Sequence, residues 1–142
     1  MRVVFDTSVL VAAARSRDGA SFALVSSIPS PRFQICLSVS LYSEWQSVLT
    51  RAEHLPPGQT ITDVQRFLRF LASQSHLQEI YFLWRPFLID PDDDMILELA
   101  FAADCRYIVT HNTHDFRGCE HLGTKAITPR DFLAIIRKTS TS

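Results

Sequence analysis

Residues 90–103 read DPDDDMILELAFAA and combine a strong helix start with a run of apolar side chains. Asp90 suits the N-cap position and Pro91 the first turn, where the missing N–H of proline costs nothing. The next two aspartates lie where the helix dipole favours negative charge. Asp94 instead begins a run that is apolar on nearly every side, and a helix of that kind is buried. A carboxylate at the start of a buried helix is therefore a candidate functional residue.

The segments on either side of this helix alternate between strand-like and helix-like patterns. Short apolar runs predict strands at residues 1–5, 33–37, 79–82, 106–109 and 126–127. Helical periodicity and capping residues predict helices at residues 9–14, 22–28 and 41–52, and further helices that begin at Thr60 and at Thr128. Such alternation predicts an α/β fold, with a mainly parallel sheet flanked by helices.

The size and composition fit one soluble globular domain. The chain has 142 residues, of which 46% are hydrophobic and 20% charged, and a chain of this length buries roughly two thirds of its unfolded surface. We expect one domain over residues 1–138 and a polar tail at residues 139–142. The sequence shows no apolar run of the roughly 20 residues needed to span a bilayer and no signal peptide. Its three cysteines lack CxxC spacing. Together these features predict a cytoplasmic protein with reduced thiols.

The charge balance restricts how this protein would bind nucleic acid. A net charge of −1 argues against broad binding to phosphates without assistance. Any nucleic-acid function must therefore use a local basic surface or bound cations.

Three further acids stand where a parallel sheet would collect them with Asp94. Asp6 follows the first predicted strand, Asp115 follows the fourth, and Glu44 lies at the edge of the apolar face of residues 41–52. Strand ends and the helix starts that follow them share one rim of such a sheet, where ligands bind. Four carboxylates there could not all stay charged without a cation. Carboxylate oxygens suit Mg²⁺ or Mn²⁺, and such ions activate water for phosphodiester hydrolysis.

Individual acids of this set also have purely structural interpretations. We expect Thr7 or Ser8 to cap the helix after the first strand, but Asp6 could itself be that cap. Glu44 could be an edge residue paired with Arg51. The ordered set, rather than any single acid, therefore points to chemistry.

The same residues resemble the PIN domain family, and in particular the PIN-type (VapC-like) ribonuclease toxins of type II toxin–antitoxin systems. The similarity covers nearly the whole chain in the family's order, at residues 3–10 (VVFDTSVL), Glu44, residues 90–100, residues 108–112 (IVTHN) and residues 115–116. It implies a three-layer α/β/α sandwich with a central, mainly parallel twisted sheet, and dependence on Mg²⁺ or Mn²⁺. It also implies RNA, single-stranded or structured, as the substrate, together with homodimers and a cognate antitoxin that blocks the site.

By this resemblance, Asp6, Glu44 and Asp94 match the first three acids of the family. Asp94 is preferred to Asp93 because it directly precedes the apolar helix pattern. We therefore assign these three acids as catalytic residues and metal ligands.

The fourth motif departs from the family pattern. Many members carry an acid two residues after its threonine, Thr110, where this chain has Asn112. Asp115 is the next acid, and we assign it as the fourth catalytic residue and metal ligand. Asn112 can still bind through its carbonyl oxygen, but it brings no charge. The hydroxyls at the rim could orient the carboxylates or contact phosphate, and helix capping and strand termination explain them equally well. Four polar residues at the rim are assigned to substrate binding: Thr7, Ser8, Thr110 and Asn112.

Three other functions compete with this interpretation. Zinc would need four loop side chains whose spacing matches no usual zinc pattern: His111, His114, Cys119 and His121. A phosphatase with Asp6 as nucleophile would need a second Asp two residues on, where Ser8 stands. A PIN fold that serves only as a binding module is the alternative from a different class, because Asn112 replaces an expected acid.

Overall fold

The protein folds around a five-stranded sheet whose strand pairs are all parallel. The computed structural model describes the backbone of residues 1–80 and 91–139. The strand order is β3-β2-β1-β4-β5, so β1 lies at the centre. The strands are β1 (Arg2–Phe5), β2 (Gln34–Leu37), β3 (His76–Leu77), β4 (Tyr107–Val109) and β5 (Lys125–Ile127). The predicted α/β fold with a mainly parallel sheet is confirmed.

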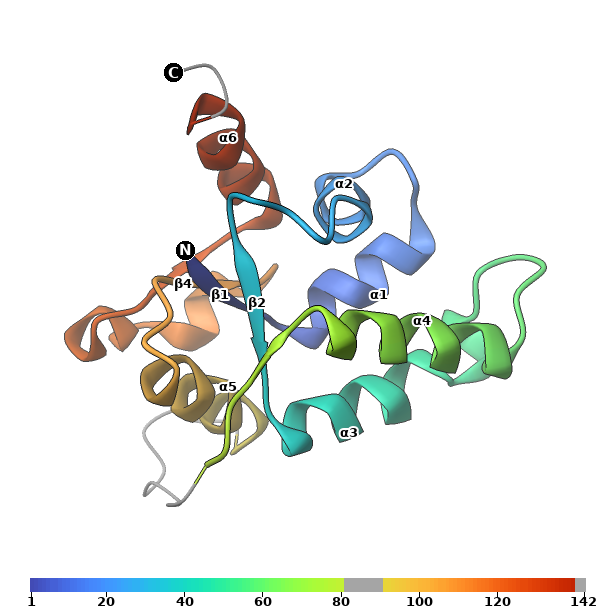
Figure 1. Cartoon of the computed structure of the whole chain (residues 1–142), viewed down its shortest axis with the longest axis horizontal. Coiled ribbons are helices and arrows are strands. Elements are labelled where there is room, and N and C mark those ends of the chain that lie inside the picture. The colour runs from blue at the N-terminus through green and yellow to red at the C-terminus, as the bar shows by residue number, and fades with distance from the viewer. Residues whose placement is uncertain (81–90, 140–142) are drawn as a thin grey trace.

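Helices cover both faces of this sheet. The α-helices described are α1 (Thr7–Arg15), α2 (Ala20–Ser26), α3 (Val39–Leu49), α4 (Ile61–Ser73), α5 (Pro91–Ala102) and α6 (Pro129–Thr139). Short 3₁₀ helices follow at η1 (Ala52–His54), η2 (Thr113–Phe116) and η3 (Cys119–Leu122). In Figure 1, α1 and α2 lie on one side of the central strands and α5 on the other. The result is the expected three-layer arrangement.

The chain changes direction across the sheet at β1. After β1 it passes through α1 and α2 to β2 on one side, whereas β4, on the other side, is reached through α5. Open α/β sheets bind ligands outside the carboxyl ends of their strands at such a switch point. Asp6 directly follows β1 and Thr110 directly follows β4, so both stand at this position.

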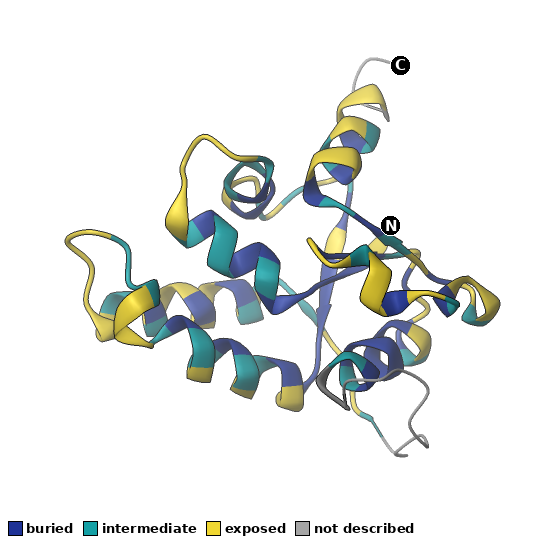
Figure 2. Ribbon diagram, turned by 180° about the vertical axis from the view of Figure 1, so that it is seen from behind, coloured by how far each residue is buried: buried dark blue, intermediate teal, exposed yellow. Residues whose placement is uncertain are grey.

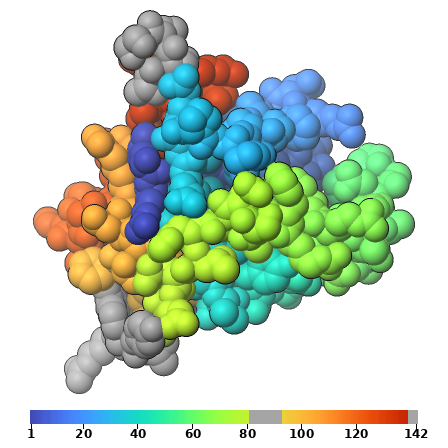
Figure 3. Space-filling view, viewed as in Figure 1, coloured from blue at the N-terminus to red at the C-terminus, as the bar shows by residue number. Residues whose placement is uncertain are grey.

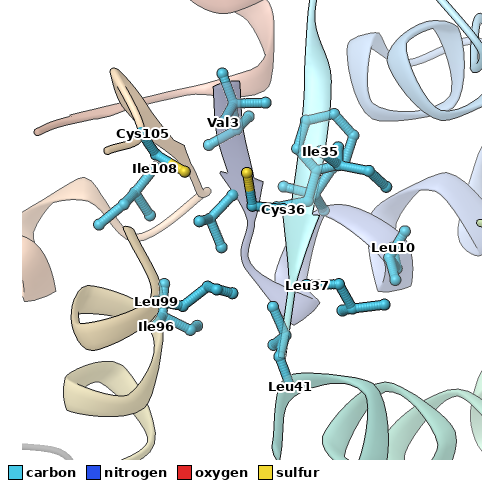
Figure 4. Packing of buried hydrophobic residues seen from close by; sticks show 14 of the residues in the cluster. Val3, Leu10, Ile35, Cys36, Leu37, Leu41, Ile96, Leu99, Cys105 and Ile108 are labelled. Atoms are coloured by element: carbon cyan, nitrogen blue, oxygen red, sulfur yellow. The ribbon is translucent and has the colours of Figure 1, made fainter. Parts of the chain in front are cut away.

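The hydrophobic core fills the space between the sheet and its helices. Most of β1, β2 and β4 and the inward helix faces are buried, and buried residues are dark blue in Figure 2. In Figure 4, Ile96 and Leu99 of α5 point toward the central strands from one side, and Leu10 of α1 lies on the other side. Leu97 and Ala100 of α5 are buried as well. The prediction of a buried helix after Asp94 is therefore confirmed.

The pair formed by α3 and α4 extends beside the sheet. Figure 3 shows α4, in green, packed next to α3, in turquoise. Thr60 begins α4 with a capping box, in which its hydroxyl accepts from the Asp63 amide at 3.2 Å and Asp63 Oδ2 accepts from the Thr60 amide at 2.9 Å. Hydrogen bonds from the Thr60 backbone and hydroxyl lower the pKa of Asp63. The helix start predicted at Thr60 is confirmed.

The strand predicted at residues 79–82 was wrong in its described part. Glu79 and Ile80 are not in a strand, and residues 81–82 lie outside the described residues. The third strand is instead His76–Leu77, which pairs with Cys36 and Leu37 of β2. A strand of two residues exists because its neighbour supplies the hydrogen bonds, so local periodicity cannot reveal it.

Several predicted helix boundaries shifted. The helix predicted over residues 41–52 ends at Leu49 and is followed by the separate turn η1. The helix predicted over residues 22–28 is α2, which begins two residues earlier at Ala20. At the C-terminus α6 continues to Thr139, so the predicted tail starts inside a helix, and its remaining residues lie outside the described ones. The predicted N-cap Asp90 also lies outside them.

The cysteines are buried free thiols. Cys36 of β2 and Cys105, which precedes β4, lie near each other in Figure 4. A hydrogen bond with Cys36, together with burial, raises the pKa of the Cys105 thiol. Of the helices in the described ranges, none has the length and apolar character needed to cross a membrane.

Candidate active site

Two hydroxyl groups hold the Asp6 carboxylate at the end of β1. Ser8 Oγ donates a hydrogen bond to Asp6 Oδ2 at 2.9 Å, and Thr110 Oγ1 donates to the same oxygen at 2.7 Å. Asp6 is only 8% exposed. Within the described part of the chain, no hydrogen bond reaches its other oxygen, Oδ1. One oxygen is thus fixed by the protein and the other can meet a ligand.

These hydroxyls do not cap α1. Asp6 occupies the N-cap position, but its side chain makes no capping hydrogen bond. Ser8 donates to Asp6 and Thr7 donates to Glu44. The predictions that Thr7 or Ser8 would cap the helix, or that Asp6 would do so through its side chain, were therefore wrong. The physical reason is that α1 begins at Thr7, so Thr7 and Ser8 lie inside its first turn rather than at the N-cap position, and their hydroxyls donate to the two carboxylates.

Glu44 is held from the neighbouring helix. Thr7 Oγ1 donates to Glu44 Oε2 at 2.5 Å, which joins residues 37 apart in the sequence. Thr7 is buried and Glu44 is half-buried, and their helices α1 and α3 pack together. Thr7 therefore orients a carboxylate, the first of the two roles considered for the rim hydroxyls.

Asp94 lies in the first turn of α5 and is 6% exposed, whereas Asp93 is half-buried. The helix contacts β1, β2 and β4 and also α3. Asp94 thus belongs to a helix that contacts both β1, which Asp6 follows, and α3, which carries Glu44. Burial favours Asp94 over Asp93 as the acid of this motif.

Glu98 is a second buried acid on α5, with 7% of its surface exposed. The sequence prediction did not include it in the site. Its signal was present, because Glu98 lies four residues after Asp94 and hence on the same helix face.

Asn112 directly precedes η2 and Asp115 lies within it, and both are exposed. The Asn112 amide donates to Thr110 Oγ1 at 3.0 Å, and the Asp115 amide donates to the Asn112 carbonyl at 3.0 Å. Because η2 contacts α5, this segment lies beside the helix that carries Asp94. Asp115 therefore occupies the outer, solvent-facing part of the rim.

The described acids do not form a set of metal ligands. In residues 1–80 and 93–138, no three histidine, cysteine or acidic side chains are grouped so that they could hold a metal ion. The zinc alternative gains no support either, because Cys119 is buried whereas His111, His114 and His121 are exposed. Hydroxyl groups hold two of the acids in place, Asp6 and Glu44.

A groove of about 530 Å³ lies apart from this rim, between α1, α2 and α4. Its described lining is mostly apolar, with Leu10, Phe22, Val64 and Phe67 among the side chains and Arg17 as the one cation. Phosphate groups would lose water there and gain one cationic partner among the described lining residues. The acid rim is therefore the better candidate for metal-dependent chemistry.

Comparison with known proteins identifies the family of this chain. A PIN domain family model matches residues 2–114. A solved structure titled "Crystal structure of VapBC2 from Rickettsia felis bound to a DNA fragment from their promoter" is similar in fold, with a TM-score of 0.56 and 13% identity. The match covers 90% of this chain and 98% of that chain. No curated protein matches significantly. With the family model covering most of its length, this chain belongs to the PIN domain family.

Proposed function

We propose that this chain is an endoribonuclease that depends on Mg²⁺ or Mn²⁺ and hydrolyses phosphodiester bonds in RNA. The observation that carries the proposal is the Asp6 carboxylate, which stands at the switch point of the sheet with one oxygen fixed by two hydroxyls. Asp94 also supports the proposal. It is a buried acid on α5, the helix that packs against β1, and a capping role does not account for it. Membership in the PIN domain family supports nuclease chemistry at this rim.

The donor atoms of the rim fit a hard divalent cation, since Mg²⁺ and Mn²⁺ prefer carboxylate oxygens. We assign four acids as ligands and catalytic residues: Asp6, Glu44, Asp94 and Asp115. Asp6 already presents Oδ1, whereas the other acids would have to approach it, because the described side chains do not form a ligand group. When bound, the ion would supply an activated water and neutralise charge on the phosphate oxygens. A chain with a net charge of −1 needs such help to bind RNA.

The rim hydroxyls orient the acids. A hydroxyl that donates to a carboxylate restricts the orientation of that carboxylate. Thr7, Ser8 and Thr110 each give their single hydrogen to Glu44 or Asp6, so none is left to donate to a phosphate. We infer that these three residues influence substrate binding through the acids that they orient. We also infer that the side-chain amide of Asn112 contacts the phosphate directly.

We further propose that the protein is a cytoplasmic toxin, that it forms homodimers, and that a cognate antitoxin blocks the rim. The support is indirect. The solved structure with a similar fold is titled as the VapBC2 complex on promoter DNA, and the PIN family model covers most of this chain.

The proposal is tested by incubating purified protein with a pool of structured and single-stranded RNA in Mn²⁺, in Mg²⁺ and in EDTA. Asp94→Asn is expected to lower the metal-dependent cleavage rate at least about 100-fold. This loss is larger than the one that follows when a metal ligand merely loses a hydrogen-bond partner. Asp93→Asn is the matched control, because it removes the same charge one residue earlier at a half-buried position. It is expected to change the rate only a few-fold.

Other outcomes would decide against parts of this proposal. Equal loss in both variants would mean that Asp94 is not the specific ligand. Equal cleavage by wild type and Asp94→Asn would indicate a contaminating nuclease. If the wild type neither cuts RNA nor binds Mn²⁺ in calorimetry, the enzyme proposal fails and a PIN fold acting as a binding module is favoured. Hydrolysis of phosphomonoesters with capture of a phosphate on Asp6 would instead favour the phosphatase.

A second expected result concerns the hydroxyl that holds Glu44. Thr7→Val keeps the shape of the buried side chain but removes the donor to Glu44 Oε2. We expect roughly a 10- to 100-fold loss of Mn²⁺ affinity or cleavage rate, the usual effect of removing a partner of a metal ligand. Thr7→Ser keeps the hydroxyl and should retain most of both. If Thr7→Val cuts at the wild-type rate, Glu44 needs no such support.

A further inference from the structure

The connection between β4 and η2 is fastened to two helices through one residue, His111. Its backbone N–H donates to Ser8 Oγ on α1 at 3.2 Å, and its ring nitrogen Nε2 lies 2.9 Å from Ser21 Oγ on α2. The two contacts span 103 and 90 residues of sequence. Neither belongs to a helix or to the sheet, so both serve to place this connection.

Ser21 is a firm anchor for the imidazole. It is 3% exposed, and its helix α2 packs against α1 and α6, whereas His111 itself is exposed. A serine hydroxyl can donate to a ring nitrogen or accept from it. The contact therefore suits either tautomer of His111. An exposed side chain is thus tied to a fixed point inside the protein.

A continuous series of hydrogen bonds leads from this anchor to the central acid. Ser21 holds the His111 ring, the His111 amide bonds Ser8, and Ser8 donates to Asp6 Oδ2. Thr110, the residue before His111, donates to the same Asp6 oxygen. If the connection moved away from α1, Asp6 would lose its Thr110 donor, and the Ser8 hydroxyl would lose the His111 N–H that donates to it.

We propose that His111 is a positioning residue, which uses the buried Ser21 to hold the β4–η2 connection on α1 and thereby orients the Asp6 carboxylate. This inference rests on the proposed function for its catalytic consequence. His111 acts through Ser8 and Asp6 and needs no contact with substrate. Replacing its ring should therefore change metal affinity and turnover rate together, while the fold stays intact.

The test compares His111→Ala, Ser21→Ala and the double variant in two measurements. Amide hydrogen exchange is followed for residues 110–112, and Mn²⁺ affinity and RNA cleavage are measured beside it. We expect faster exchange and roughly a 10- to 100-fold loss of affinity or rate in each single variant. The double variant should be no worse than the singles, because both remove the same contact.

Two control variants separate positioning from general damage. His111→Gln places an amide where the Nε2 atom stood and should restore slow exchange and most of the activity. His121→Ala removes an exposed histidine from η3, outside the rim, and should behave as the wild type does.

Distinct results would overturn the proposal. Unchanged exchange at residues 110–112 in His111→Ala would mean that the ring does not hold the connection. Additive losses in the double variant would mean that the two residues act separately. If a variant shows faster exchange but cuts RNA and binds Mn²⁺ as the wild type does, His111 has no role in function. Hydrogen exchange can be measured without catalysis. If the wild type cuts no RNA, the proposed function is rejected, but the exchange data still show whether the His111–Ser21 contact holds the connection.

Discussion

Replacing Asp6 with Asn is expected to reduce metal-dependent RNA cleavage by a factor on the order of 10³. The carboxylate would face the cation directly through Oδ1. Two unit charges about 4 Å apart at the edge of a protein interact by about 4 kcal/mol, and each 1.36 kcal/mol is about a factor of ten. Mn²⁺ affinity, measured by calorimetry, should fall in parallel with the cleavage rate.

The fold should survive this change, because the Asn carbonyl oxygen can still accept from Ser8 and Thr110 at the Oδ2 position. Thermal unfolding in EDTA checks this directly. Asp18→Asn is the control, since it removes an equal charge from an exposed position in a turn and should leave cleavage unchanged. If Asp6→Asn retains activity within a few-fold, Asp6 is not the central ligand and the proposed mechanism loses its main support.

The largest expected effect on stability comes from Trp45→Ala. Trp45 is fully buried on α3, and truncating such a side chain costs about 3–5 kcal/mol because the cavity collapses only in part. The free energy of unfolding of such domains is only about 5–15 kcal/mol, so the variant should be barely stable at 37 °C. Urea unfolding followed by circular dichroism measures the loss.

Trp45→Phe is the matched variant, and it should cost much less. The Trp45 indole nitrogen Nε1 is buried without a hydrogen-bond partner among the described residues. A buried donor left unpaired costs about 1–3 kcal/mol, so its removal offsets part of the volume lost. If Trp45→Phe is as damaging as Trp45→Ala, the N–H has a partner that matters. If Trp45→Ala costs under about 1 kcal/mol, the site repacks around the gap.

Local patterns predicted the elements that carry their own signals. The helix α5 was evident because its apolar residues follow directly after a proline and aspartates that favour a helix start. Strands β1, β2, β4 and β5 were evident because short apolar runs suit a sheet covered on both faces. Strand β3 was not, because its two residues are extended only through pairing with β2.

The candidate site likewise has a part that local sequence patterns predicted and a part that they did not. The sequence placed Asp6 after a strand and Asp94 at the start of a buried helix, and the structure shows Asp6 directly after β1 and Asp94 buried in the first turn of α5. Their assignment as metal ligands stays a prediction. The hydroxyl donors were located, but their acceptors were not, since Thr110 reaches Asp6 across 104 residues of sequence.

The sequence by itself determined the fold class, the family and which acids are candidate metal ligands. These properties follow from short-range periodicity, capping and residue order, which each segment carries alone. Only the tertiary structure decided that Thr7 holds Glu44, that Ser8 and Thr110 converge on one oxygen of Asp6, and that His111 is tied to Ser21. Such pairings depend on where packing brings distant segments within about 3 Å of each other, and no local pattern encodes that distance.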